Sequence, residues 1–268
     1  MNKTIVITGG SSGIGAAAAR ELRRRGAEVA ITGRSEETGR LAREIGAEAF
    51  LADFSKLDEV RALAEKLLAR FPQIDVLANN VGGIIQTRQV TPDGHEKTLQ
   101  INHLGGFLLT LLLRERLEAS GATVINTSSG AHRLGRIDLS DMQSERKYSP
   151  WRAYGSAKLM NILHAAELTR RFRGVQAVSF HPGVVATGFA REGSSAVRFL
   201  YESALKKIFM IPPEKGADTL VWLATSAPVR DWEPGSFYIR RKKAATSSEA
   251  ADPALARELW AFSEEAVG

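Results

Sequence analysis

A tyrosine and a lysine lie four residues apart within residues 152–161, where an apolar helical pattern begins. Residues with this spacing lie on one face of a helix, one turn apart. A phenol with a pKa of about 10 is a poor acid near neutrality, but a cation within about 4–6 Å favours its ionised form. Tyr154 and Lys158 are therefore a candidate proton donor and its electrostatic support. For the pair taken alone, an exposed pair on an amphipathic helix remains the alternative.

A glycine-rich loop follows the β-branched run at residues 3–8 and reads Gly9-Gly10-Ser11-Ser12-Gly13-Ile14-Gly15. Residues 16–25 then have a helical pattern with a small-residue inner face. Between a strand and a helix, glycines let the backbone approach a pyrophosphate, whose charge suits the helix N-terminus. The order strand, loop, helix predicts a phosphate-binding loop. A plain connection between strand and helix is the alternative.

The second predicted strand, residues 28–32, ends in Gly33-Arg34-Ser35. At this point of a dinucleotide-binding fold, an acidic residue suits a ribose 2′-hydroxyl and an arginine suits a 2′-phosphate. Arg34 offers a planar fork of donors, and Ser35 adds another. The sequence therefore predicts that NADP(H) is preferred over NAD(H). A solvated loop arginine is the alternative.

Predicted strands and helices alternate along the chain, which is typical of parallel βαβ units. No repeat, low-complexity tract or linker divides the chain, so we expect one domain over residues 1–268. The predicted strands are 3–8, 28–32, 47–52, 75–78, 122–127, 175–180 and 236–240, and the predicted helices are 16–25, 36–45, 57–70, 92–119, 154–171, 214–225 and 253–265.

The composition is that of a soluble globular protein, with 44% hydrophobic and 25% charged residues among 268. There is no cysteine, which excludes disulfides, thiolate nucleophiles and cysteine-ligated metals and fits a reducing compartment. The net charge of +6 favours anionic ligands in a general way. We expect no metal site, because the histidines lack a carboxylate-rich ligand spacing. They are His95, His103, His132, His164 and His181.

Nothing in the sequence predicts a membrane or nucleic-acid partner. The first residues already form a strand pattern, with no signal peptide before it. The longest apolar stretch, residues 104–113, contains two glycines and is too short for a bilayer. The basic run at residues 240–243 lacks interleaved aromatics and is interpreted as a solvated rim. We expect a soluble cytoplasmic protein without a membrane anchor.

Two long segments are candidates for covering a site. Residues 131–150 form a polar loop that is long for a connection inside a compact domain. Residues 188–211 mix glycine, serine, aromatic and basic residues without a strand pattern, and we expect a substrate cover there. Its apolar side chains either line an apolar substrate pocket or form the inner face of a covering helix. They are Phe199, Leu200, Tyr201, Phe209 and Met210.

Taken together, the motifs resemble the short-chain dehydrogenase/reductase family over nearly the whole chain, in family order. The matching residues are Thr8-Gly9-x-x-x-Gly13-x-Gly15, Asp53, Asn79-Asn80-Val81-Gly82, Asn102, Ser129, Tyr154-x-x-x-Lys158 and Pro182-Gly183. The three-residue gap between Gly9 and Gly13 is similar to that of the compact members. Val81 departs from the family, which usually has alanine there.

A closer resemblance is to the retinol-dehydrogenase-like branch. It rests on residues 126–132, 139–148, 156–161, 181–185 and 256–260. Vertebrate members often carry an N-terminal membrane anchor, which is not seen here, so retinoids are one possible substrate among others. The resemblance implies a doubly wound, parallel seven-stranded sheet with helices on both faces.

The resemblance also implies a role for each matching residue in hydride transfer. Tyr154 is the acid/base, Lys158 holds the nicotinamide ribose and stabilises the tyrosinate, and Ser129 binds the substrate oxygen, with Ser128 as the alternative. Asn102, a mediocre helix residue, binds a water that links Lys158 to solvent. The implied cofactor-binding residues are Gly9, Ser11, Ser12, Gly13, Ile14, Gly15, Arg34, Ser35, Asp53 (to adenine), Phe54, Asn80, Val81, Gly82, Tyr154, Lys158, Pro182, Gly183, Val185 and Thr187 (to the carboxamide).

These roles predict an NADP(H)-dependent oxidoreductase acting on a carbonyl or alcohol substrate of apolar character. A non-catalytic NADP-binding sensor is the alternative, although such proteins typically lose the tyrosine or the lysine, and both remain here. Light-driven double-bond reduction is disfavoured by the absence of cysteine. Family members often pair through the helices that hold Asn102 and Tyr154, and the long loop before Tyr154 could obstruct this, so a homo-oligomer stays open.

Overall fold

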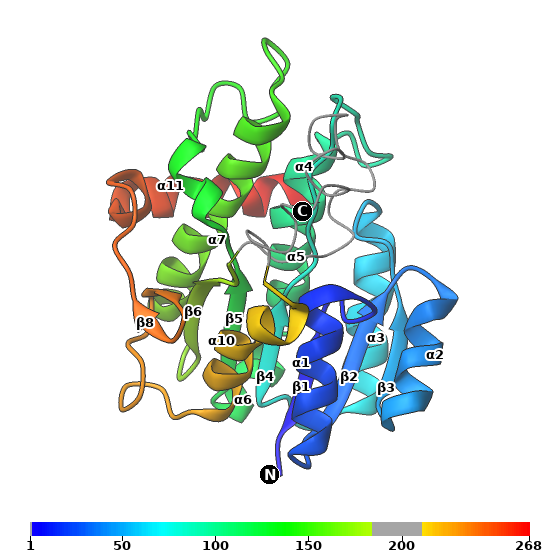
Figure 1. Ribbon diagram of the computed structural model, residues 1–268. Helices are drawn as coiled ribbons and strands as arrows, with labels where there is room; N and C mark the ends of the chain where they lie inside the picture. Colours follow the sequence, from blue (N-terminus) through cyan, green and yellow to red (C-terminus); the bar gives the residue numbers. More distant parts are fainter. Residues whose placement is uncertain (1, 184–210) are drawn as a thin grey trace.

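One sheet contains every strand of residues 2–183 and 211–268, the part of the chain that the structure, a computed structural model, describes (Figure 1). Its strand order is β3-β2-β1-β4-β5-β6-β7-β8. The first seven strands are parallel, and the order reverses between β1 and β4. The strands are β1 Thr4–Ile7, β2 Glu28–Gly33, β3 Glu48–Leu51, β4 Val76–Asn79, β5 Thr123–Thr127, β6 Gln176–His181, β7 Phe237–Ile239 and β8 Lys242–Lys243. The predicted doubly wound parallel sheet is confirmed.

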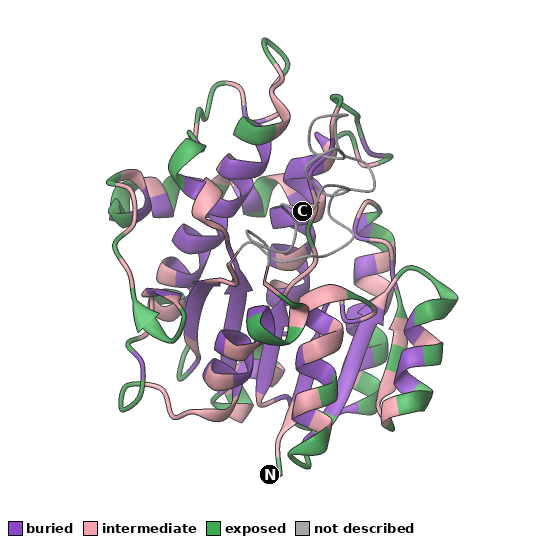
Figure 2. Ribbon diagram, in the orientation of Figure 1, coloured by how far each residue is buried: buried purple, intermediate pink, exposed green. Residues whose placement is uncertain are grey.

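Helices cover both faces of this sheet, so its central strands β1, β4, β5 and β6 are largely buried, whereas β3 and β8 at the two edges are partly or fully exposed (Figure 2). Successive strand residues point to opposite faces: Ile5 and Ile7 pack with α1, α2 and α10, whereas Val6 packs with α3, α5, α7 and α11. The helices are α1 Gly13–Arg24, α2 Glu36–Ile45, α3 Leu57–Arg70, α4 Lys97–Leu99, α5 Gly105–Leu112, α6 Arg114–Ser120, α7 Pro150–Arg171, α10 Pro213–Thr225 and α11 Pro253–Val267. The predicted bounds of α2 and α3 are confirmed.

The predicted count of seven strands is corrected to eight for the described residues, because the chain turns back after β7. Arg240 and Arg241 both have positive φ, at 50° and 61°. Two left-handed residues form a hairpin turn that suits the twist of the flanking strands, and Ile239 pairs antiparallel with Lys242 across it. The basic run is therefore part of a hairpin, and the Arg241 guanidinium pairs with Asp218.

The predicted helix 92–119 is also corrected, because the structure divides it. Helix starts only at Lys97, after Glu96, whose carboxylate accepts from Thr98 N–H and Leu99 N–H. Residues Gln100–Leu104 form a π-helix, η1, between α4 and α5. The Asn102 Nδ2 donates to the Thr98 carbonyl at 2.9 Å, which is the acceptor that the Asn102 backbone N–H would take in an α-helix. Asn102 therefore competes for a helical acceptor at the point where the helix widens.

The long loop at 131–150 begins with a 3-10 helix, Gly130–Leu134, and then packs on residues 85–98. The Gln143 Oε1 accepts from Glu96 N–H at 2.7 Å. The Tyr148 hydroxyl donates to the Ile85 carbonyl at 2.6 Å. The loop thus covers the start of the helix that carries Asn102. No helix among the described residues is long and apolar enough to cross a membrane.

The helix α11 packs against α7 and α5 through Trp260, which is 3% exposed. Its ring centroid lies 4.9 Å from that of Phe107, 5.7 Å from His164 and 6.0 Å from Phe172. The Arg171 guanidinium lies 4.9 Å from the Trp260 ring centroid. The outer side of the helix that carries Tyr154 and Lys158 is therefore covered by this chain's own last helix (Figure 1).

Candidate active site

Tyr154, Lys158 and Asn161 lie on the face of α7 that packs on the carboxyl end of β5. Tyr154 is 7% exposed and Lys158 2% exposed. The Lys158 Nζ lies 5.4 Å from the Tyr154 ring centroid and donates to the Thr127 carbonyl at 3.3 Å. The predicted phenol–ammonium pair is therefore brought together at the edge of the sheet where doubly wound folds bind ligands.

The two serines that follow β5 have different surroundings. The Ser128 hydroxyl is buried and donates to the Lys158 carbonyl at 2.7 Å, so it joins β5 to α7. The Ser129 Oγ accepts from Ala131 N–H at 3.2 Å and hydrogen-bonds to Tyr154. Of the two hydroxyls, that of Ser129 therefore contacts the phenol.

Burial dominates the electrostatics of the pair. It raises the pKa of Tyr154 above its ordinary value, and the hydrogen bond to Ser129 opposes this only in part. Burial also lowers the pKa of Lys158 to about 7. The pKa of Tyr154 is therefore raised although a lysine lies beside it, because desolvation penalises the charged phenolate. That Lys158 stabilises the tyrosinate in the complete site stays a prediction.

The low pKa of Lys158 predicts a pH-dependent stability. Between about pH 7 and its ordinary pKa of 10.5, the unfolded chain binds a proton at Lys158 that the folded protein does not, so stability rises with pH. Lys158→Met should therefore raise the free energy of unfolding relative to the wild type most strongly below pH 7. This gain should shrink as the pH approaches 10. Urea unfolding from pH 6 to 10 measures this, with exposed Lys66→Met as the control. A gain that is the same at every pH would contradict it.

Asn102 holds the loop that follows β4 next to Lys158. Its Oδ1 accepts from Gly83 N–H at 3.0 Å, and its Nδ2 donates to the Gly83 carbonyl at 2.9 Å. A Cβ on Gly82 would lie 2.5 Å from the Asn102 Oδ1 and 2.7 Å from the Lys158 Nζ, so a larger residue here would displace one of these side chains. Both polar atoms of the Asn102 side chain therefore hydrogen-bond to groups of the protein. The prediction that Asn102 binds a water that links Lys158 to solvent stays a prediction.

The predicted phosphate loop is suited to an anion. The backbone N–H groups of Gly13, Ile14 and Gly15 have no hydrogen-bond partner within the described residues, and the Ser12 side chain does not cap them. The first turn of α1 contains no acidic side chain, whereas Asp252 caps the start of α11. Three free donors at a positive helix end are what a pyrophosphate requires.

The glycines of this loop are required by close packing. A Cβ on Gly15 would lie 2.3 Å from the Gly9 carbonyl oxygen and 2.8 Å from the Asn80 Nδ2. Gly9 itself has a φ of 64°, in the left-handed region. The loop is therefore folded back on itself where the predicted cofactor would bind.

The side chains predicted for the adenosine end lie together beyond β2. The exposed Arg34 follows the strand, and its charge acts on Asp53. The Ser11 hydroxyl lies against Gly33, where a Cβ would be 3.0 Å away. The pKa of Asp53 is lowered: burial opposes this, but the Ser55 N–H and hydroxyl donors and the charge of Arg34 outweigh it. Ser35 precedes α2, and its side chain caps no helix N–H.

Two predicted cofactor residues are engaged within the protein. The Phe54 side chain is 3% exposed and packs against Gly105. The Asn80 Nδ2 donates to the Thr8 carbonyl at 3.1 Å, and its Oδ1 accepts from the Thr127 hydroxyl at 3.1 Å. Phe54 and Asn80 therefore support the site with their side chains, and their contact with a cofactor stays a prediction.

Thr8, directly after β1, holds the glycine-rich loop in place, a role that its position in the motif did not predict. Its hydroxyl donates to the Ala78 carbonyl at 3.2 Å and accepts from Asn80 N–H at 2.9 Å and Val81 N–H at 3.2 Å. This ties the first glycine of the loop to the turn after β4. A hydroxyl residue that ends an otherwise apolar strand is the signal that could have identified it.

The remaining predicted positions divide between described and undescribed residues. Pro182 and Gly183 follow β6, and Gly183 has a φ of 92°. Val185 and Thr187 lie outside the described residues, as do Phe199, Leu200, Tyr201, Phe209 and Met210. Within the described part of the chain, no group of three or more histidine or acidic side chains could hold a metal ion.

A doubly wound sheet, a glycine-rich loop at the start of α1 and a Tyr–Lys pair beside the end of β5 are typical of dinucleotide-dependent oxidoreductases. The short chain dehydrogenase family matches residues 3–197. The chain belongs to that family. Its members transfer hydride between NAD(P) and alcohol or carbonyl groups, so the chain is an NAD(P)-dependent oxidoreductase.

The relatives extend the match over the whole chain. DnrU, the proposed daunorubicin C-13 ketoreductase of Streptomyces sp. (strain C5), is 45% identical, with 99% of this chain and 93% of DnrU covered. Retinol dehydrogenase 12 of Mus musculus is 38% identical, with 99% and 86% covered. These similarities confirm the resemblance to the retinol-dehydrogenase-like branch.

Solved structures show the same fold. A protein of unassigned function from Mycobacterium paratuberculosis is 34% identical with a TM-score of 0.80, over 99% of this chain and 93% of that one. An alcohol dehydrogenase from the archaeon Thermococcus sibiricus, complexed with 5-hydroxy-NADP, is 25% identical with a TM-score of 0.65, over 85% of this chain and 92% of that one.

Proposed function

We propose that this protein is an NADP(H)-dependent reductase of ketones or aldehydes of apolar character, with Tyr154 as its acid/base. The observation that carries the proposal is the meeting of Tyr154, Ser129 and Lys158 at the carboxyl end of β5. The retained tyrosine and lysine favour an enzyme over a sensor. The names of DnrU and of the retinol dehydrogenases, a ketoreductase and dehydrogenases of an apolar alcohol, support the substrate class.

In the proposed reaction, the bound cofactor supplies the hydride to the carbonyl carbon. Ser129 holds the carbonyl oxygen, and Tyr154 donates its proton to that oxygen as the C–O bond becomes a single bond. Lys158 would hold the ribose hydroxyls of the bound cofactor and would stabilise the resulting tyrosinate. In the alcohol-oxidising direction, Tyr154 removes the hydroxyl proton.

The test is NADPH oxidation over a panel of aliphatic, aromatic and polycyclic aldehydes and ketones. We expect turnover that is fastest with the apolar members. Cofactor binding without turnover on any carbonyl, and without NADP⁺ reduction by the matching alcohols, would contradict the proposal and favour the sensor.

The preference for NADP(H) is proposed to rest on Arg34. Arg34→Asp should lower the ratio of kcat/KM for NADPH to that for NADH by about 10- to 100-fold, because a charge-assisted contact to the 2′-phosphate is replaced by repulsion. Steady-state kinetics with both cofactors measures the ratio. Arg40→Asp on α2 makes the same charge change at an exposed ion pair with Glu37 and should leave the ratio unchanged. Equal use of both cofactors by the wild type would contradict the assignment.

We further propose a cytoplasmic protein that acts as one domain over residues 1–268. The absence of cysteine supports a reducing compartment, and the single sheet supports one domain. A homo-oligomer remains open. Within the monomer, α11 covers one side of α7 and α5. Two copies of the chain that pair through α7 and α5 must therefore use the surface of these helices that α11 leaves uncovered. Sedimentation measures the assembly state.

A further inference from the structure

We propose that Asn161 is a positioning residue that holds Lys158 in place for the reaction, and that His103 and Ser263 fix its orientation from η1 and α11. This inference rests on the proposed function for its catalytic consequence. Asn161 lies one turn beyond Lys158 on α7 and is 5% exposed. It belongs to none of the groups that contact a substrate or cofactor in the proposed reaction.

The Asn161 amide bridges two segments of the active site. Its Nδ2 donates to the Asn102 carbonyl at 3.0 Å and to the Thr127 carbonyl at 3.1 Å. The Lys158 Nζ donates to the same Thr127 carbonyl at 3.3 Å. Asn161 and Lys158 therefore share one acceptor at the end of β5, and Asn161 also ties that acceptor to the π-helix.

The orientation of this amide is fixed by a chain of hydrogen bonds. Because Nδ2 faces two carbonyls, the Asn161 Oδ1 faces the His103 Nδ1 at 3.2 Å, and that nitrogen must carry a proton. Burial lowers the pKa of His103 to about 4, so the ring is neutral and its Nε2 accepts. The Ser263 hydroxyl, 3.0 Å away on α11, has one proton, for which the His103 Nε2 competes with the Leu259 carbonyl at 2.8 Å. The His103–Asn161 hydrogen bond therefore has one direction at neutral pH, and Ser263 is the side-chain donor beside the His103 Nε2.

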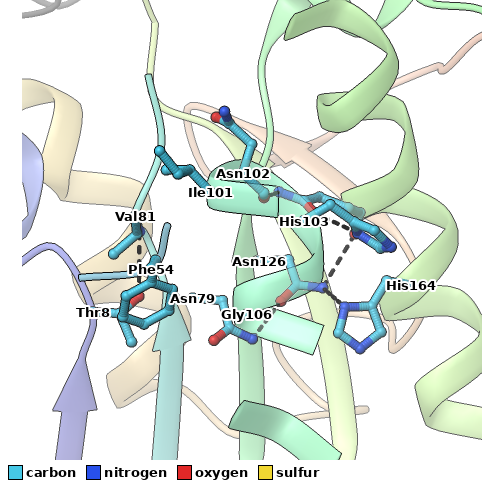
Figure 3. A pocket seen from close by; sticks show the side chains of 11 residues that line it. Thr8, Phe54, Asn79, Val81, Ile101, Asn102, His103, Gly106, Asn126 and His164 are labelled. Atoms are coloured by element: carbon cyan, nitrogen blue, oxygen red, sulfur yellow. Dashed lines mark hydrogen bonds between the residues drawn. The ribbon is translucent and has the colours of Figure 1, made fainter. Parts of the chain in front are cut away.

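A second buried network holds the other side of Asn161. The Asn126 Nδ2 donates to the Asn161 carbonyl at 3.2 Å and to the His164 Nδ1 at 3.2 Å, and its Oδ1 accepts from the Asn79 Nδ2 at 3.1 Å. Figure 3 shows Asn79, Asn126 and His164 linked below Asn102. The cavity among these side chains has a volume of about 10 Å³, far too small for a substrate. The network is therefore a support for the site.

Loss of the Asn161 amide has a specific consequence for Lys158. The Thr127 carbonyl would keep Lys158 as its side-chain donor, and the ammonium would move toward it and away from Tyr154. A stronger hydrogen bond to the charged form raises the pKa of the lysine. Among the described residues, the other titratable groups that face Lys158 are Tyr154 on α7 and His103 on η1. Asn161→Leu also removes the acceptor of the His103 Nδ1, which lowers the pKa of His103 further, so this ring stays neutral and adds no charge beside Lys158.

The test compares Asn161→Leu, which keeps the side-chain volume, with the wild type. The first readout is the titration of Lys158 followed by NMR of its Cε group, assigned with Lys158→Met. We expect its midpoint to rise in Asn161→Leu. The second readout is the kinetics with a substrate found for the wild type: kcat should fall about 10- to 100-fold, as for a misplaced catalytic group, while KM for the carbonyl changes little.

Two further variants separate positioning from a general loss of stability. Thr169→Val, on the same helix, removes a hydroxyl that donates to the Ala165 carbonyl and accepts from Ala177 N–H. It should leave the Lys158 midpoint and kcat unchanged. Ser263→Ala should raise the midpoint of the Lys158 titration by a smaller amount than Asn161→Leu does. Ser263→Thr, which keeps the hydroxyl, should have the midpoint of the wild type.

The outcomes are separable from those of the proposed function. A shifted Lys158 titration in a protein that turns over no carbonyl would overturn the reductase and keep the positioning role. An unchanged titration together with an unchanged kcat in folded Asn161→Leu would overturn the positioning role alone. Equal shifts in Asn161→Leu and Thr169→Val would also overturn it, because the effect would then be structural.

Discussion

Tyr154→Phe is expected to lower kcat for carbonyl reduction by about 10²- to 10⁴-fold, the usual contribution of a general acid. The substitution removes only the hydroxyl, and the ring keeps its buried position and its contact with Lys158. NADPH binding, measured by fluorescence titration, should therefore change little. Single-turnover kinetics under saturating cofactor separates the loss of chemistry from a loss of binding.

Tyr148→Phe is the matched control for this change. The Tyr148 hydroxyl donates to the Ile85 carbonyl and hydrogen-bonds to Thr98, so its removal also deletes the contacts of a half-buried phenol. We expect kcat within a few-fold of the wild type. Activity retained in Tyr154→Phe, or lost equally in both variants, would contradict the acid/base role of Tyr154.

Trp260→Ala is expected to lower the free energy of unfolding by about 3–5 kcal/mol, the range for a large buried aromatic. The indole is 3% exposed and packs edge-on against Phe107 and Phe172, so its removal leaves a cavity between α11, α5 and α7. Urea unfolding followed by far-UV circular dichroism measures the change.

Trp151→Ala provides the comparison at the other end of α7. Its side chain is 48% exposed, and surface substitutions usually change stability by about 0.5 kcal/mol or less. A similar loss in both variants would show that α11 is no more important to the fold than an exposed helix start. A loss confined to Trp260→Ala would confirm that α11 is an integral layer.

The regular elements were predictable because local patterns agree with the tertiary fold. The apolar spacing and the polar ends of α2 and α3 predict their observed bounds. The β7–β8 hairpin was missed because Arg240-Arg241 lacks the asparagine or glycine that normally marks such a turn. The division of the helix at Gln100–Leu104 was missed because it depends on contacts from distant segments, such as that of Asn102 with Gly83.

The site was predictable where a motif places a side chain and its chemistry together. Tyr154 and Lys158 meet as their spacing requires, and Ser129 rather than Ser128 contacts the phenol. Whether a side chain faces a ligand or the protein could not be predicted, as Phe54 and Asn80 show. The raised pKa of Tyr154 depends on burial by the complete fold, which no spacing reports.

The π-helix at Gln100–Leu104 has a consequence for insertions and deletions in this chain. A π turn holds one more residue than a turn of α-helix, so the helices on either side keep their orientation although the chain between them is one residue longer. Loss of one residue from this turn would restore a regular α-helix between α4 and α5. It would remove the widened turn from which the Asn102 side chain reaches Gly83. The length of this turn is therefore a requirement of the site, beside the identity of its asparagine.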